Sequence, residues 1–166
     1  MTLYVLRHGV AEEIGPEGDD RSRRLTPGGR RKMRIAAAGM RALGLRFDVL
    51  LTSPFARAAE TAAIASEALG GPAPRMLPAL EQGVPPVETV RALIEFARAE
   101  HVAIVGHEPG LSGVVALLLT GSVDGARLLL KKGGLVALEA REPGRRGTTA
   151  VLRWMLTPRQ LRRLGS

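Results

Sequence analysis

The sequence predicts an α/β protein, a three-layer sandwich in which helices cover both faces of a mostly parallel central sheet. Short apolar runs with the length of strands alternate with longer stretches of helical periodicity. The run at residues 102–105 is apolar without interruption, which is typical of a central parallel strand covered on both faces. No linker, internal repeat or low-complexity tract divides the 166 residues, so we expect a single domain over residues 1–166.

The expected strands are short stretches made mostly of apolar residues. These runs lie at residues 3–6, 47–52, 76–77, 102–105, 135–140 and 150–155, with a turn at 142–147 between the last two. Residues 10–24 are rich in charged residues, glycine and proline and have no apolar periodicity. We therefore expect them to form a loop over one end of the sheet.

The helices are expected between these strands, and their ends carry capping signals. Thr26 is suited to the N-cap of the first helix, Pro27 to its first position, and Gly44 to its end. The other helices are expected at residues 55–69, 87–100, 111–119 and after Thr157 and Pro158.

The composition is basic and arginine-rich. The formal net charge is +8, and cysteine is absent, which removes disulfides, thiolate chemistry and cysteine metal sites. A binding module for nucleic acid is one interpretation. We favour the interpretation that the arginines are spread over solvated helix faces, because aromatic residues, on which bases could stack, make up only 3% of the chain. The positive charge would also attract an anionic substrate or an acidic partner.

The sequence gives no sign of membrane insertion or export. It has no run of about 18 apolar residues, and its first residues show no signal-peptide pattern. We therefore expect a cytoplasmic protein that contacts neither membrane nor nucleic acid and exists as a monomer or weak dimer.

Chemically useful residues follow three of the expected strands. Arg7 and His8 follow the first, Ser53 and Arg57 the second, and His107 the fourth. The carboxyl ends of parallel strands share one edge of a sheet, where ligands bind in open α/β folds. Two arginines and two histidines gathered there would form a cage for an anion such as phosphate. Taken alone, residues 7–9 could instead be an ordinary turn.

Three motifs, in this order, resemble those of the histidine phosphatase superfamily, which includes the phosphoglycerate mutases. They are residues 6–9 (Leu-Arg-His-Gly), residues 53–58 (Ser-Pro-Phe-Ala-Arg-Ala) with Thr61, and residues 105–109 (Val-Gly-His-Glu-Pro). The short chain and the helix start at residues 25–29 are similar to the compact SixA-type phosphohistidine phosphatases. The resemblance runs nearly end to end and implies a phosphoglycerate mutase-like fold.

The resemblance also implies roles for particular residues. His8 would take the phosphoryl group, while Arg7, Arg57 and His107 would bind the phosphate and stabilise its charge. Glu81 lies in about the place of the family's proton donor, although it could be an ordinary loop carboxylate. Weaker alternatives for that donor are Glu12, Glu13, Asp19 and Asp20. Ser53 would either contact the phosphate or cap the second helix.

The sequence leaves the substrate open. We expect a phosphatase without cofactor or metal that acts through a phosphorylated His8, with phosphohistidine in a protein as the substrate. An alternative is a phosphomonoesterase or mutase of the same superfamily that acts on a small phosphate ester. A third hypothesis, from another class, is a basic binding module without catalytic activity.

Overall fold

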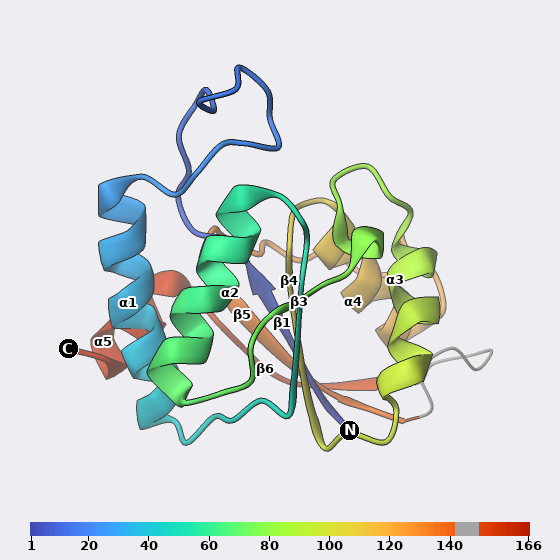
Figure 1. Cartoon of the computed structure of the whole chain (residues 1–166). Coiled ribbons are helices and arrows are strands. Elements are labelled where there is room, and N and C mark those ends of the chain that lie inside the picture. Colours follow the sequence, from blue (N-terminus) through green and yellow to red (C-terminus); the bar gives the residue numbers. More distant parts are fainter. Residues whose placement is uncertain (142–149) are drawn as a thin grey trace.

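The centre of the molecule is a six-stranded sheet, seen here in a computed structural model that describes residues 1–141 and 150–166. The strands are β1 (Thr2–Arg7), β2 (Val49–Thr52), β3 (Arg75–Met76), β4 (His101–Gly106), β5 (Leu135–Ala140) and β6 (Ala150–Leu156). Their order across the sheet is β3-β2-β4-β1-β5-β6 (Figure 1).

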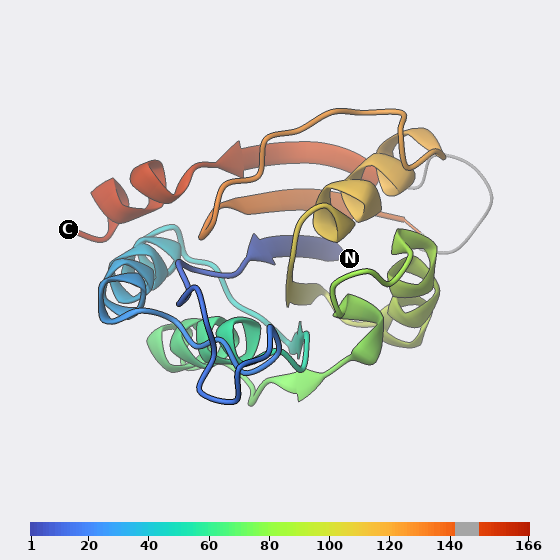
Figure 2. The same ribbon diagram turned by 90° about the horizontal axis from the view of Figure 1, so that it is seen from above.

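Helices lie on both faces of the sheet, as the sequence predicts. They are α1 (Pro27–Ala42), α2 (Ala56–Leu69), α3 (Pro86–Ala92), α4 (Gly110–Thr120) and α5 (Pro158–Leu164). Helices α1, α2 and α5 cover one face, and α3 and α4 cover the other, which gives three layers (Figures 1 and 2).

The direction of the strands decides where a ligand can bind. Strands β3, β2, β4 and β1 are parallel neighbours, whereas β5 runs antiparallel to β1 and β6 antiparallel to β5. The carboxyl ends of β1, β2 and β4 therefore meet at one edge of the sheet. The loop at residues 10–24 also lies at this end of the molecule (Figure 1).

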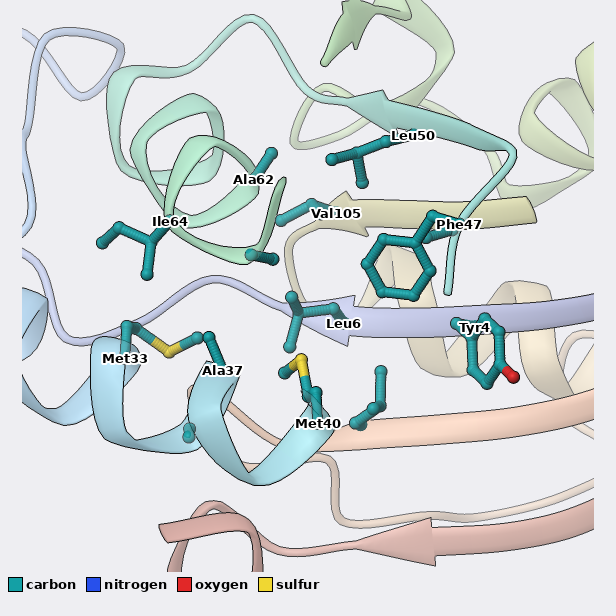
Figure 3. Close-up of a cluster of buried hydrophobic side chains, with 14 of the residues drawn as sticks. Tyr4, Leu6, Met33, Ala37, Met40, Phe47, Leu50, Ala62, Ile64 and Val105 are labelled. Atoms are coloured by element: carbon teal, nitrogen blue, oxygen red, sulfur yellow. The ribbon is translucent and has the colours of Figure 1, made fainter. Parts of the chain in front are cut away.

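The inner strands bury both of their faces. In β1, Tyr4 and Leu6 point into the core beneath α1 and α2, while Leu3 and Val5 point into the core beneath α3 and α4. Figure 3 shows Leu6 of the first core between Met40 of α1 and Val105 of β4. This two-sided burial explains why the central strands are continuous apolar runs rather than alternating ones.

The expected ends of α1 and the expected start of α5 are confirmed. The Thr26 side chain accepts a hydrogen bond from the Gly29 N–H at the start of α1, and Gly44 has a φ of +70° just beyond its end. Thr157 and Gln160 form a capping box at the start of α5.

Two expected boundaries are wrong. The helix expected at residues 87–100 ends at Ala92 and continues as a 3₁₀ turn over Leu93–Phe96, in which Ile94 is 50% exposed. The tighter turn rotates the side chains away from the face that a continuous α-helix would bury. The strand expected at residues 47–52 begins at Val49, although Phe47 is still buried. The turn expected at residues 142–147 lies outside the described residues.

Across the described ranges, the helices are too short or too polar to cross a membrane.

Helices α1 and α5 approach closely at Gly39, where an added Cβ would overlap the backbone carbonyl of Leu161. We expect Gly39→Ala to lower the free energy of unfolding by about 1–3 kcal/mol, because backbone cannot move aside as a flexible side chain can. Gly28→Ala is the matched control in the same helix, since nothing lies within 4 Å of its added Cβ. It should be neutral or stabilising by up to about 1 kcal/mol. Urea denaturation measures both, and equal stability of the two variants would contradict this packing.

Candidate active site

His8 lies directly after β1, and the residue is 6% exposed. Its Nδ1 lies 2.7 Å from the backbone carbonyl oxygen of Gly9. Because a carbonyl oxygen only accepts hydrogen bonds, Nδ1 carries the proton in the neutral ring. The lone pair is therefore on Nε2, for which the described residues supply no hydrogen-bond partner. This nitrogen is a nucleophile that needs no base to activate it.

The turn after His8 is fastened to α2 through Thr61. The Gly9 N–H donates to Thr61 Oγ1 at 3.1 Å, and the same hydroxyl donates to the Arg57 carbonyl at 2.7 Å. Thr61 is fully buried, so these bonds are shielded from water. The backbone beside His8 is thus connected to the helix that carries Arg57.

His107 faces His8 across the site. It follows β4, and the centroids of the two imidazole rings are 5.1 Å apart. Its Nε2 lies 2.9 Å from Ser53 Oγ, while Nδ1 is buried and has no partner among the described residues. When Ser53 donates to Nε2, Nδ1 carries the proton and can donate to a bound anion.

Ser53 is fully buried at the end of β2. Its hydroxyl accepts a hydrogen bond from the Phe55 N–H at 3.3 Å and contacts His107 at 2.9 Å. The N-cap residue of α2 is Phe55, which makes no side-chain cap bond. In this geometry Ser53 orients the His107 ring. A direct contact with phosphate stays a prediction.

Arg57 lies in the first turn of α2, and only 2% of it is exposed. Its Nη1 donates to the Asp20 carbonyl at 2.6 Å, and its Nη2 donates to the Asp20 carboxylate at 2.9 Å. A further bond of 3.0 Å joins Nη2 to Gln82 Oε1, and the guanidinium lies over the Phe55 ring. These contacts hold the guanidinium in one orientation through Nη1 and Nη2 and do not use its Nε–H.

Arg7, the last residue of β1, is held by the segment that precedes β5. Its Nη1 donates to the Leu130 carbonyl at 2.8 Å. Its Nε is buried and has no hydrogen-bond partner in the described part of the chain. The guanidinium therefore keeps donors that a bound anion could use.

Glu81 lies near the site but is engaged in an ion pair. Its carboxylate accepts two hydrogen bonds from Arg21, at 3.0 and 3.3 Å. Glu81 also lines a small cavity together with Gln82 and His107. Its expected role as proton donor is compatible with this position but stays a prediction.

The structure thus brings together the residues expected to bind and transfer a phosphoryl group, which are Arg7, His8, Ser53, Arg57 and His107, with Glu81 beside them. Of the weaker proton-donor candidates, Asp20 contacts Arg57, whereas Glu12 and Asp19 accept hydrogen bonds within the loop at residues 10–24. Sequence reasoning missed the contacts of Asp20 and Gln82 with Arg57. Asp20 counted only as one of several loop carboxylates, and no pattern singled out Gln82. Three-residue clusters of metal-ligating side chains are absent from the described residues.

The surroundings keep both site histidines neutral. Burial lowers the pKa of His8 to about 3, helped by His107 when that ring is protonated and by the charges of Arg57 and Arg7, although the bond to Gly9 opposes this shift. Burial also lowers the pKa of His107 to about 4, together with the charges of Arg57 and Arg7 and against the carboxylate of Asp20. Near neutral pH the lone pair of His8 is therefore available. An arriving anion meets two permanent positive charges.

A nucleophilic nitrogen, two guanidiniums and a second imidazole around one point form a site suited to phosphoryl transfer. The family model described as the histidine phosphatase superfamily (branch 1) matches residues 3–82. An uncharacterized protein of Picosynechococcus sp. is 34% identical over 146 residues, which cover 84% of this chain and 86% of that protein. The chain belongs to the histidine phosphatase superfamily.

Solved structures show the same fold. The protein histidine phosphatase SixA in complex with tungstate matches with a TM-score of 0.86 at 22% identity, covering 97% of this chain and 99% of SixA. The α-ribazole phosphatase of Shigella flexneri matches with a TM-score of 0.72 at 19% identity, covering 95% and 97% of the two chains. These likenesses establish the architecture, and superfamily membership supports phosphatase activity.

The lowered pKa values of His8 and His107 make stability depend on pH. In the unfolded chain both imidazoles return to the ordinary pKa of 6.5, whereas in the folded chain the values are about 3 and about 4. The unfolded state therefore binds more protons as the pH falls below 6.5, so the free energy of unfolding should fall with it. Urea denaturation between pH 7.5 and 4.5 measures this slope.

The variants His8→Asn and His107→Asn each remove one of these groups, so each should show a shallower loss of stability over the same pH range. Slopes equal to that of the wild-type protein would contradict the burial of neutral imidazoles.

Proposed function

We propose that this protein is a phosphatase that receives a phosphoryl group on His8 and passes it to water, with phosphohistidine in a protein as its substrate. The observation that carries this proposal is the fixed tautomer of His8. Its Nδ1 is bound to the Gly9 carbonyl, which leaves the lone pair on Nε2, and the charges of Arg57 and Arg7 are close enough to act on the ring.

In the first step, Nε2 of His8 attacks the phosphorus atom, and the bond from phosphorus to the leaving group breaks. Arg7, Arg57 and His107 surround the phosphoryl oxygens and offset the negative charge as it redistributes. As Nε2 forms its bond to phosphorus, the ring gains positive charge, which the Nδ1–H bond to Gly9 stabilises.

In the second step, water attacks the phosphorus of phosphorylated His8. The nitrogen–phosphorus bond breaks, its electron pair returns to Nε2, and inorganic phosphate leaves. The attacking water loses its proton to the phosphate or to a nearby base. The same arginines hold the phosphoryl group in both steps, so the group stays in place between them.

Phosphohistidine suits the observed position of Glu81. An imidazole that is already protonated leaves as a neutral ring and needs no further proton. An alcohol leaving group needs a proton donor, and the expected donor, Glu81, is paired with Arg21. The likeness to SixA, described as a protein histidine phosphatase, supports the same substrate class.

A second candidate substrate is a small phosphate ester. A groove of about 620 Å³ lies next to the cavity that contains His107, and its walls include Val84, Pro86, Pro109 and Leu128. This volume is typical of pockets that bind small molecules. The likeness to an α-ribazole phosphatase supports this candidate.

His8→Ala should lower kcat for p-nitrophenyl phosphate at least about 10³-fold, because the nucleophile is lost. His101→Ala is the matched control, since His101 begins β4 at the end opposite to His107. This control should keep activity close to wild type. Equal rates for His8→Ala and the wild-type protein would remove His8 from the mechanism.

Glu81→Gln separates the two substrate classes. We expect it to lower kcat/KM for phosphoserine about 100-fold, the usual effect of losing a proton donor, and to change kcat/KM for a histidine-phosphorylated peptide by less than about threefold. Arg21→Gln is the control, because it removes the ion pair and keeps the carboxylate. If Glu81→Gln reduces both activities equally, the leaving-group argument is wrong. A higher wild-type kcat/KM for phosphoserine than for the peptide would favour the small ester.

A further inference from the structure

One side of the molecule next to the candidate active site is strongly basic. We define the basic face as nine cations on α1, on the turn at residues 131–134 and on α5. Eight of them are exposed and Arg162 is half-buried. They are Arg31, Lys32, Arg34, Arg41, Lys131, Lys132, Arg159, Arg162 and Arg163. These three segments contain no aspartate or glutamate.

The basic face holds the whole positive excess of the protein. Nine of the 24 basic residues lie on it, and the other 15 nearly balance the 16 acidic residues of the chain. Within the described ranges, none of the nine takes part in an ion pair, whereas Arg30 of α1 is paired with Glu60 of α2. Unpaired like charges repel one another, and a bound anionic partner would relieve that repulsion.

Three residues of the basic face line a small cavity beside Gly9, the residue after His8. Lys32 of α1, Lys132 of the turn and Arg162 of α5 line a cavity of about 30 Å³ together with Gly9 and Gly133. That space holds a group the size of a water molecule or a carboxylate. Gly9 is the residue whose carbonyl fixes the His8 ring.

The turn that carries Lys132 is attached directly to the catalytic end of β1. The Gly133 N–H is shared between the carbonyl oxygens of Arg7, at 3.0 Å, and His8, at 3.1 Å. Arg7 in turn donates to the Leu130 carbonyl at 2.8 Å. A partner that touches Lys132 therefore contacts the residue next to Gly133, which is itself hydrogen-bonded to the backbone of Arg7 and His8. Figure 2 shows the turn between α5 and the tip of β1.

We propose that the basic face docks an acidic surface of the phosphorylated protein substrate, with one carboxylate in the cavity among Lys32, Lys132 and Arg162. This proposal rests on the proposed function and adds where the substrate protein binds. Contact with the face places the substrate beside Gly9, from where its phosphorylated side chain reaches Nε2 of His8. The attraction also accelerates the encounter at low ionic strength.

The face fits an acidic protein better than a nucleic acid. None of its three segments contains an aromatic residue on which a base could stack. The cavity admits a carboxylate on a flexible side chain, whereas a nucleic acid presents bulky phosphodiesters along a continuous backbone. A substrate protein must also approach His8, which the face adjoins.

Binding of two labelled peptides tests the proposal without relying on catalysis. The peptides share one sequence around a histidine and differ in carrying either four glutamates or four glutamines. Fluorescence anisotropy at 50 mM salt should show at least about tenfold tighter binding of the glutamate peptide, with the preference lost at 500 mM salt.

Charge reversal locates the site. Lys132→Glu and Arg162→Glu should each weaken binding of the glutamate peptide about tenfold, as expected for rim charges placed near an opposite charge. Arg98→Glu is the matched control, because this exposed arginine lies just before β4, at the far end of the sheet. It should bind the peptide as wild type does. Lys132 is exposed whereas Arg162 is half-buried, so the Lys132 variant remains informative if Arg162→Glu folds poorly.

Kinetics separate this proposal from the proposed function. With the histidine-phosphorylated peptides, the reversals should raise KM for the glutamate peptide only and leave hydrolysis of p-nitrophenyl phosphate unchanged. If neither phosphopeptide is hydrolysed, the proposed substrate is wrong, whatever the binding shows. Equal binding of the two peptides, binding unaffected by the reversals, or tighter binding of a 20-nucleotide DNA would each overturn the docking proposal.

Discussion

The hydrogen bond from His8 Nδ1 to the Gly9 carbonyl governs what the rest of the site can do. It gives Nδ1 the proton and leaves the lone pair on Nε2, so the ring attacks from one defined atom. The bond depends on the turn after β1, which Thr61 ties to α2 and which the Gly133 N–H ties to the turn at residues 131–134. Strand β1, helix α2 and the turn at residues 131–134 thus together fix the orientation of one imidazole.

The same region concentrates positive charge that the fold does not fully neutralise. Arg57 is almost completely buried and is met by a single carboxylate, that of Asp20, while a buried nitrogen of Arg7 and one of His107 have no partner among the described residues. Such an arrangement costs stability in the free protein and is offset when an anion binds. The basic face lies next to these residues. Positive charge therefore extends from the surface that would attract the substrate to the residues that would bind its phosphoryl group.

Much of this architecture can be predicted from the sequence, because it follows from short-range rules. Apolar runs predict the strands, and capping residues predict both ends of α1 and the start of α5. Parallel strand pairing predicts that Arg7, His8, Arg57 and His107 lie at one edge of the sheet. The rest depends on contacts between distant residues. Asp20 reaches Arg57 from a loop without periodicity, and Ser53 meets His107 across 54 positions of sequence. No local pattern encodes either contact, nor the 3₁₀ turn that ends α3 early.

The most direct test of the account is the position of the phosphoryl group on the enzyme. The protein is mixed with a phosphorylated substrate, quenched in alkali within milliseconds, and examined by peptide mapping and phosphorus NMR. We expect phosphohistidine at His8, attached through Nε2, because Nδ1 is bound to Gly9. A phosphoryl group on Nδ1 of His8, on His107, or on no histidine at any time during turnover would contradict it.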